Sequence, residues 1–264
     1  MRPSDQRGCH TTVPDTIRIC DHISPLLRID DAALREYAER LKRRVSRVAS
    51  DNALTRRTIH GAVQGLQDAP DRDDLLRHLV TQDCPRAAHA LLRQLAGALP
   101  PARDRITCHL VPSAGTHGAG NCVADDQLLV TIPATEEAIP WMEFVIAHEY
   151  SHTQTDCPID RATVRDFLIS EGLAMVLAET FAAKPHPYPW DQVPPEQEAA
   201  FWKGVDPDAR GLDAYATYMN SDASYEAGAR VVRSYLRRHS ISIAEAHHRP
   251  LSELYWDSGC EFVR

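Results

Sequence analysis

The sequence predicts an α+β protein that is mostly helical and contains one small sheet. Long stretches before Pro100 and after Pro140 repeat their apolar residues every three or four positions, which is the period of an amphipathic helix. Only two short central stretches are rich in leucine, valine and isoleucine in the manner of strands. The 264 residues are 43% hydrophobic and 25% charged, which is ordinary for a globular chain with ample material for a core.

The first hundred residues are expected to form a helical N-terminal extension. Residues 1–30 have no clear period and are expected to be loop and strand. A helix is predicted over residues 31–49, because the apolar side chains fall on one stripe and the charges elsewhere. Two or three shorter helices are predicted around residues 53–66, 73–82 and 85–99. Pro100 and Pro101 end the last of them, since proline cannot donate the backbone hydrogen bond of a helix.

Two strands are predicted next, over residues 106–111 and 127–132. Residues 113–121 separate them and contain glycines that are not in the dinucleotide-binding order, so we expect a flexible loop there. We interpret His109 and His117 as ordinary strand and loop residues and not as ligands.

A helix entered at Pro140 contains the most informative motif of the chain, His148-Glu149-Tyr150-Ser151-His152. Residues four apart on a helix project from one face, so both imidazoles can reach a single zinc ion. Glu149 lies at the edge of that face, where it can act on water as a general base without becoming a ligand. This is the H-E-x-x-H pattern of zinc peptidases.

A second helix, with Asp160 as its expected N-cap, supplies a third candidate ligand. Glu171 falls on the apolar face of this helix, where a bare carboxylate does not belong. The chain after His152 is long enough for a turn and a return helix, so Glu171 can come back to the metal. His148, His152 and Glu171 would then leave the fourth zinc position open to water. The alternative is a solvated Glu171 on a partly exposed helix.

The last part of the chain is predicted to be an irregular connection followed by helices. The many prolines of residues 184–195 exclude a regular helix. A helix is predicted over residues 222–239, with Tyr225 on its apolar stripe. The pair His247-His248 is expected at a helix end, and it is a poor metal site because neighbouring side chains point in different directions.

These motifs resemble the gluzincin class of metallopeptidases and, more narrowly, the DUF2268 family of predicted zinc-dependent proteases. Four segments carry the narrower resemblance: residues 146–152 (IAHEYSH), 169–174 (ISEGLA), 224–228 (SYEAG) and, more weakly, 108–113 (CHLVPS). The resemblance extends over roughly residues 88–254. It implies a zincin-like metallopeptidase domain over residues 101–264, next to the helical extension of residues 1–100 or continuous with it.

The resemblance also implies a Zn²⁺ cofactor and a reaction, the hydrolysis of peptide or other amide bonds. Glu149 would take a proton from the attacking water and deliver it to the leaving amine. Residues 127–132 would be the edge strand that holds the substrate backbone by strand addition. Tyr225 is the candidate oxyanion donor, and its alternative role is that of a core aromatic.

The sequence is also compatible with two other functions. The protein could be a specialised hydrolase that acts on one small amide or one dedicated peptide. It could also be a non-catalytic binding protein with a structural zinc, although such sites usually have four protein ligands, commonly including cysteine. Cys157 is the only cysteine near the motif in the sequence.

Composition and charge narrow the expected partners and location. The net charge of −8 argues against nucleic-acid binding, and the basic run at residues 42–47 is expected to be a solvated helix face. The 7 cysteines are scattered without a CxxC pair, which favours reduced thiols and a cytoplasmic protein. Residues 1–8 lack the apolar stretch of a signal peptide, and the longest apolar segment is too short for a membrane span. We therefore expect a peptide or small amide substrate, without nucleic-acid or membrane partners, and leave the oligomeric state open.

Overall fold

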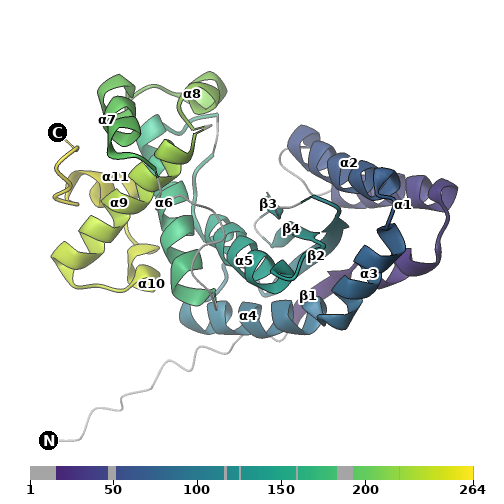
Figure 1. The fold of residues 1–264 in the computed structure, drawn as a ribbon. Helices are drawn as coiled ribbons and strands as arrows, with labels where there is room; N and C mark the ends of the chain where they lie inside the picture. Colours follow the sequence, from purple (N-terminus) through teal and green to yellow (C-terminus); the bar gives the residue numbers. More distant parts are fainter. Residues whose placement is uncertain are drawn as a thin grey trace, which may run out of the picture.

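A four-stranded sheet with helices on both faces is followed in the chain by a second, wholly helical part (Figure 1). The computed structural model describes residues 16–46, 52–115, 118–124, 126–158, 160–182, 193–219 and 221–263. Among the described helices, none combines the length and the apolar character that a membrane crossing requires.

The sheet has the strand order β1-β2-β4-β3. Its strands are β1 (Thr16–Asp21), β2 (Arg105–Ser113), β3 (Ala119–Ala124) and β4 (Gln127–Pro133). Strands β1, β2 and β4 are parallel, whereas β3 runs antiparallel to β4. The two central strands are buried along almost their whole length, in agreement with their aliphatic sequences. Both predicted strands, at residues 106–111 and 127–132, are confirmed.

The structure corrects two predictions about the region before the predicted metal-binding helix. Residues 113–121 are not a loop throughout, because β3 begins at Ala119 and pairs with β4. Residues 127–132 are not an edge strand, because β4 is covered by β2 on one side and β3 on the other. The sequence of β3, AGNCVA, has little strand propensity of its own, because alanine, glycine and asparagine make up four of its six residues. The segment is a strand because its backbone forms hydrogen bonds with β4.

The predicted N-terminal helices are confirmed, and they pack against the sheet and its helices. They are α1 (Asp31–Ser46), α2 (Asn52–Asp68), α3 (Arg72–Thr81) and α4 (Cys84–Ala98), preceded by the short 3-10 helix η1 (Ser24–Arg28). The predicted end of the first helix, residues 47–49, lies outside the described residues. Strand β1 pairs with β2, so residues before 100 contribute directly to the sheet. The Tyr150 hydroxyl donates a 2.6 Å hydrogen bond to the carbonyl of Leu99, just after α4.

Helices α2 and α5 (Ala138–Gln154) cover opposite faces of the sheet (Figure 1). Two neighbouring residues of β3 show this, since successive strand residues point to opposite faces. Asn121 donates a 2.9 Å hydrogen bond from Nδ2 to Thr58 Oγ1 on α2. Gly120 lies against Glu149 on α5. The predicted metal-binding helix is therefore packed directly on the β3–β4 side of the sheet.

Helix α6 (Val164–Phe181) packs against α5 and brings Glu171 back toward the histidines, as predicted. Its N-cap is Thr163 and not Asp160, which corrects the predicted start. Thr163 Oγ1 accepts a hydrogen bond from the Asp166 backbone N–H, and the Asp166 carboxylate accepts one from the Thr163 backbone N–H. This reciprocal capping box stabilises the start of the helix more than a lone Asp160 would.

The C-terminal helices surround the far side of α6. They are α7 (Pro195–Gly204), α8 (Gly211–Tyr218), α9 (Asp222–His239), α10 (Ile243–Ala246) and α11 (Leu251–Trp256). The predicted helix over residues 222–239 is confirmed. Most of the predicted irregular connection, residues 184–195, lies outside the described residues. Helices α8 and α9 share with α6 a small second core that is built around Phe167 and Leu168.

Candidate metal centre

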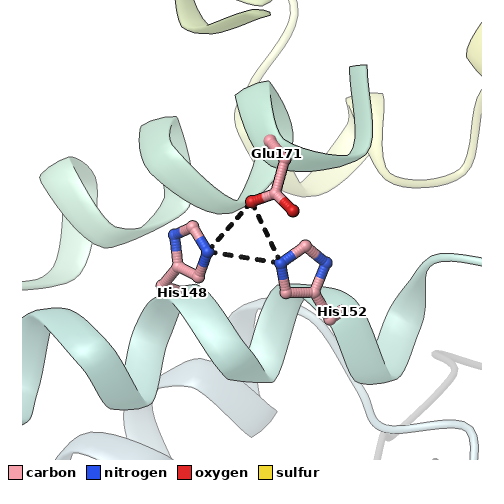
Figure 2. A group of neighbouring side chains, drawn as sticks. All are labelled: His148, His152 and Glu171. Atoms are coloured by element: carbon pink, nitrogen blue, oxygen red, sulfur yellow. Dashed lines mark hydrogen bonds and ion pairs between the residues drawn. The ribbon is translucent and has the colours of Figure 1, made fainter. Parts of the chain in front are cut away.

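Three side chains from two buried helices converge on one point (Figure 2). His148 and His152 lie one turn apart on α5, and their Nε2 atoms are 3.2 Å from each other. Glu171 reaches them from α6, with Oε2 at 3.2 Å from His148 Nε2 and 3.4 Å from His152 Nε2. Among the described residues, these three form the only cluster of histidine, cysteine and acidic side chains close enough to hold one metal ion.

The spacing of these three atoms fits a tetrahedral zinc ion. Ligand atoms about 2.0–2.1 Å from a tetrahedral zinc lie about 3.3 Å from one another. The triangle between the two Nε2 atoms and Oε2 has edges of 3.2, 3.2 and 3.4 Å. Glu171 Oε2 is buried, and its partners among the described residues are the two imidazole nitrogens of the same triangle. Three buried donor atoms that point at one another form an arrangement that a divalent metal ion would satisfy.

The side chains of this cluster change one another's pKa. Burial by itself would raise the pKa of Glu171, but the adjacent His152 and His148 outweigh burial and hold that pKa below its ordinary range. Burial alone would likewise lower the pKa of His152, yet the Glu171 carboxylate raises it to about 9. Zinc binds the neutral imidazole, so metal binding at this site would be coupled to proton release.

Glu149 lies beside the three converging groups but is not one of them. It is only 8% exposed, and burial raises its pKa, while His148 and His152 act in the opposite direction. The backbone N–H of Cys122 on β3 donates a hydrogen bond to its carboxylate. A Cβ at Gly120 would lie 2.5 Å from Cγ of Glu149, so only glycine leaves room for this side chain under the strand. Strand β3 thus covers and orients the carboxylate.

Tyr225 on α9 stands next to the centre. Its ring centroid is 6.3 Å from that of His148. The nearby Glu171 carboxylate, and then burial, raise the pKa of Tyr225 far above its usual value, so the phenol keeps its proton and can donate a hydrogen bond. Its hydroxyl is hydrogen-bonded to that of Tyr215 on α8. The sequence pattern does not predict Tyr215 as a site residue, because it predicts no helix over α8.

Two other histidines singled out in the sequence, His109 and His247, are not part of the three-residue cluster. His109 Nδ1 is 3.1 Å from Nε2 of His22, and the two rings are stacked within the core. His247 follows α10 and bonds Ser151 Oγ at 2.8 Å through Nε2 and the Ile243 carbonyl at 2.8 Å through Nδ1. Burial lowers the pKa of His247 to about 4. His117 lies outside the described residues.

The fold and the donor set define a protein with a candidate metal site on two helices, made of two histidines and one glutamate and flanked by a buried carboxylate and a phenol. The chain belongs to the DUF2268 family, described as predicted Zn-dependent proteases, and residues 104–255 match that family. The match begins at the start of β2 and ends in α11, so it contains every residue of the site. No curated protein matches this sequence.

Proposed function

We propose that the protein is a zinc-dependent peptidase in which His148, His152 and Glu171 hold the metal. The observation that carries this proposal is the triangle of ligand atoms, whose edges fit a tetrahedral zinc ion. Membership of a family of predicted zinc-dependent proteases supports the same function. A zinc ion bound there supplies Lewis acidity toward the scissile carbonyl and lowers the pKa of water.

Glu149 is the proposed general base. Its carboxylate lies next to the ligand histidines, and the Cys122 backbone N–H holds it in place. Burial raises its pKa, which brings its basicity closer to that needed for proton transfer near neutral pH. Glu149 takes the proton of the attacking water and later delivers it to the leaving amine.

Strand β3 is the proposed docking edge for an extended peptide. It ends the strand order of the sheet, so its outer edge is not covered by another described strand. Gly120 of this strand touches Glu149, which places the open edge beside the general base. A peptide added to that edge would make backbone hydrogen bonds and bring its carbonyl groups past the metal.

Tyr225 is the proposed oxyanion donor, and Tyr215 is its hydrogen-bond partner. The phenol lies beside His148 and remains protonated, as a donor to a developing oxyanion must. Tyr215 restricts the positions that the Tyr225 hydroxyl can adopt. A purely structural role of Tyr225 in the core agrees less well with the Glu171 carboxylate being the largest cause of its raised pKa.

The proposal includes a substrate class and a cellular location. A specialised hydrolase for one small amide or one dedicated peptide uses the same residues and differs only in the substrate. We infer a cytoplasmic protein, because the described cysteines are all free thiols. The net charge of −8 supports a peptide or small amide partner over a nucleic acid.

The test of this proposal is the digestion of a diverse peptide library by the zinc-loaded full chain. Cleavage should stop on addition of a chelator and return with zinc. The Glu149→Gln variant, which keeps the proposed ligands, should lose at least about 10²–10⁴-fold in turnover. If the zinc-loaded wild-type protein cleaves neither peptides nor small amides, the peptidase proposal is wrong. A non-catalytic binding protein with a structural zinc would then explain the site better. The spectrum of the cobalt-substituted protein then tells an N/O site with water from thiolate ligation.

A further inference from the structure

The two candidate histidine ligands differ in what surrounds their second ring nitrogen. His152 Nδ1 lies 3.3 Å from the hydroxyl of Ser170, a residue of α6 that is only 4% exposed. His148 Nδ1 is buried and finds no hydrogen-bond partner in the described part of the chain. Its ring is flanked instead by the rings of Phe144 and Tyr225, at centroid distances of 6.4 and 6.3 Å.

The Ser170 hydroxyl does not follow the usual pattern of a hydroxyl inside a helix. Such groups commonly donate to the carbonyl one turn back, and Thr180 of the same helix does so, at 2.7 Å from the Val176 carbonyl. The Ser170 hydroxyl faces His152 across the interface between α5 and α6. On its other side it is hydrogen-bonded to the thiol of Cys157.

The direction of these hydrogen bonds follows from the chemistry of a ligating imidazole. A neutral histidine that binds metal through Nε2 carries its proton on Nδ1 and donates it to a partner. The Ser170 oxygen can accept that hydrogen bond while its own proton is donated onward. Cys157 is then the acceptor at the end of a chain that runs from His152 through Ser170.

We propose that Ser170 is a positioning residue that fixes the tautomer and the ring orientation of His152, with Cys157 holding Ser170 in place. This inference rests on the proposed zinc site. It also gives Cys157 a role other than that of a fourth ligand. Cys157 is not among the three side chains whose ligand atoms converge on one point.

Zinc affinity of the full chain, measured by competition with a chromophoric chelator, tests the inference. Ser170→Ala should weaken zinc binding about 10- to 100-fold, as the loss of a partner to a metal ligand typically does. Ser170→Thr keeps the hydroxyl and should bind within a few-fold of wild type. Ser151→Ala is the matched control, because it removes another buried hydroxyl of this region that bonds the non-ligand His247. Its affinity should stay close to that of wild type.

A second measurement reports on the hydrogen bond itself. In the zinc-loaded wild-type protein, nitrogen NMR should show His152 protonated at Nδ1, with an N–H that exchanges slowly with solvent. In Ser170→Ala that exchange should become faster, whereas the N–H of His148 should not change. A purely structural role of Ser170 would not produce this difference between the two rings.

The outcomes separate this inference from the function on which it rests. A wild-type protein that binds zinc, together with a Ser170→Ala variant that binds it equally well, would overturn the role of Ser170 and leave the zinc site standing. Equal losses in Ser170→Ala and Ser151→Ala would also overturn it, since the effect would then be general. A wild-type protein that does not bind zinc would refute the proposed function itself, and this inference with it.

Discussion

Gly172 and Gly228 face each other where α6 crosses α9, and the two backbones meet there without intervening side chains. A Cβ at Gly172 would collide with the carbonyl of Gly228, and a Cβ at Gly228 would collide with the carbonyl of Leu168. Gly172 directly follows Glu171, and Gly228 lies one turn after Tyr225. The close crossing therefore sets the position of the phenol relative to the third candidate ligand.

We predict that Gly172→Ala and Gly228→Ala each destabilise the protein. The added methyl group meets backbone atoms that cannot rotate away, so the helices must separate, at a cost of about 1–3 kcal/mol or more. Urea unfolding measures this change. Gly61→Ala on α2 is the control, because a Cβ at this position would meet no other atom within 4 Å. This variant should leave stability unchanged or raise it by up to about 1 kcal/mol. Equal stability of all three variants would contradict the close crossing.

Gly120→Ala should impair catalysis more than metal binding. Its Cβ would lie 2.5 Å from Cγ and 2.7 Å from Oε1 of Glu149, so the proposed base has to move. We expect a loss of turnover with nearly unchanged zinc affinity, measured on the same preparation. Gly65→Ala serves as the control, since its nearest neighbour would be Ala114 Cβ at 3.8 Å, an ordinary contact. Full turnover in Gly120→Ala would show that β3 does not constrain the carboxylate.

Tyr225→Phe should lower kcat about 10²–10³-fold, which is the effect of losing one oxyanion donor. The ring and its packing against His148 remain, so zinc content should not change. Stability should fall only by the lost hydrogen bond to Tyr215, about 0.5–1.5 kcal/mol. Tyr215→Phe should have a smaller effect on kcat, because it removes the partner of the donor and not the donor. If Tyr225→Phe turns over at the wild-type rate, Tyr225 is a core aromatic only.

His247 should make folding stability depend on pH between about pH 4 and 6.5. Its pKa is lowered from 6.5 to about 4 in the folded protein, so in this window the unfolded chain binds the extra proton. Stability is therefore fully present above pH 6.5 and falls as the pH is lowered, by at most about 1.4 kcal/mol per pH unit for this group. Unfolding free energies at several pH values should show a shallower fall in His247→Gln. Parallel curves for the two proteins would contradict a buried neutral His247.

The periodic parts of the sequence predicted their structure well. The helix over residues 222–239 has the predicted bounds, because its amphipathic pattern of one apolar and one polar face continues over its whole length. The pairing of His148 and His152 follows from helix geometry alone. The return of Glu171 to them was predictable because a carboxylate on an apolar face needs a partner.

The remaining features depend on contacts between segments that are distant in the sequence. Strand β3 forms on the edge of β4 although its own residues, including Gly120, have little strand propensity. Tyr215 reaches the site through a hydrogen bond with Tyr225, and no local pattern predicts such a contact. The N-cap at Thr163 depends on Asp166, whereas the sequence pattern predicts a single capping residue, Asp160.

Zinc content after mild chelation tests the central claim most directly. The wild-type protein should hold one zinc ion per chain, and Glu171→Gln should lose it, because the amide replaces one of only three proposed protein ligands. Glu149→Gln is the matched control, since it changes a neighbouring buried glutamate in the same way but removes no ligand, and it should keep its zinc. Full zinc occupancy in Glu171→Gln, or its loss in Glu149→Gln, would contradict the assignment of these two glutamates.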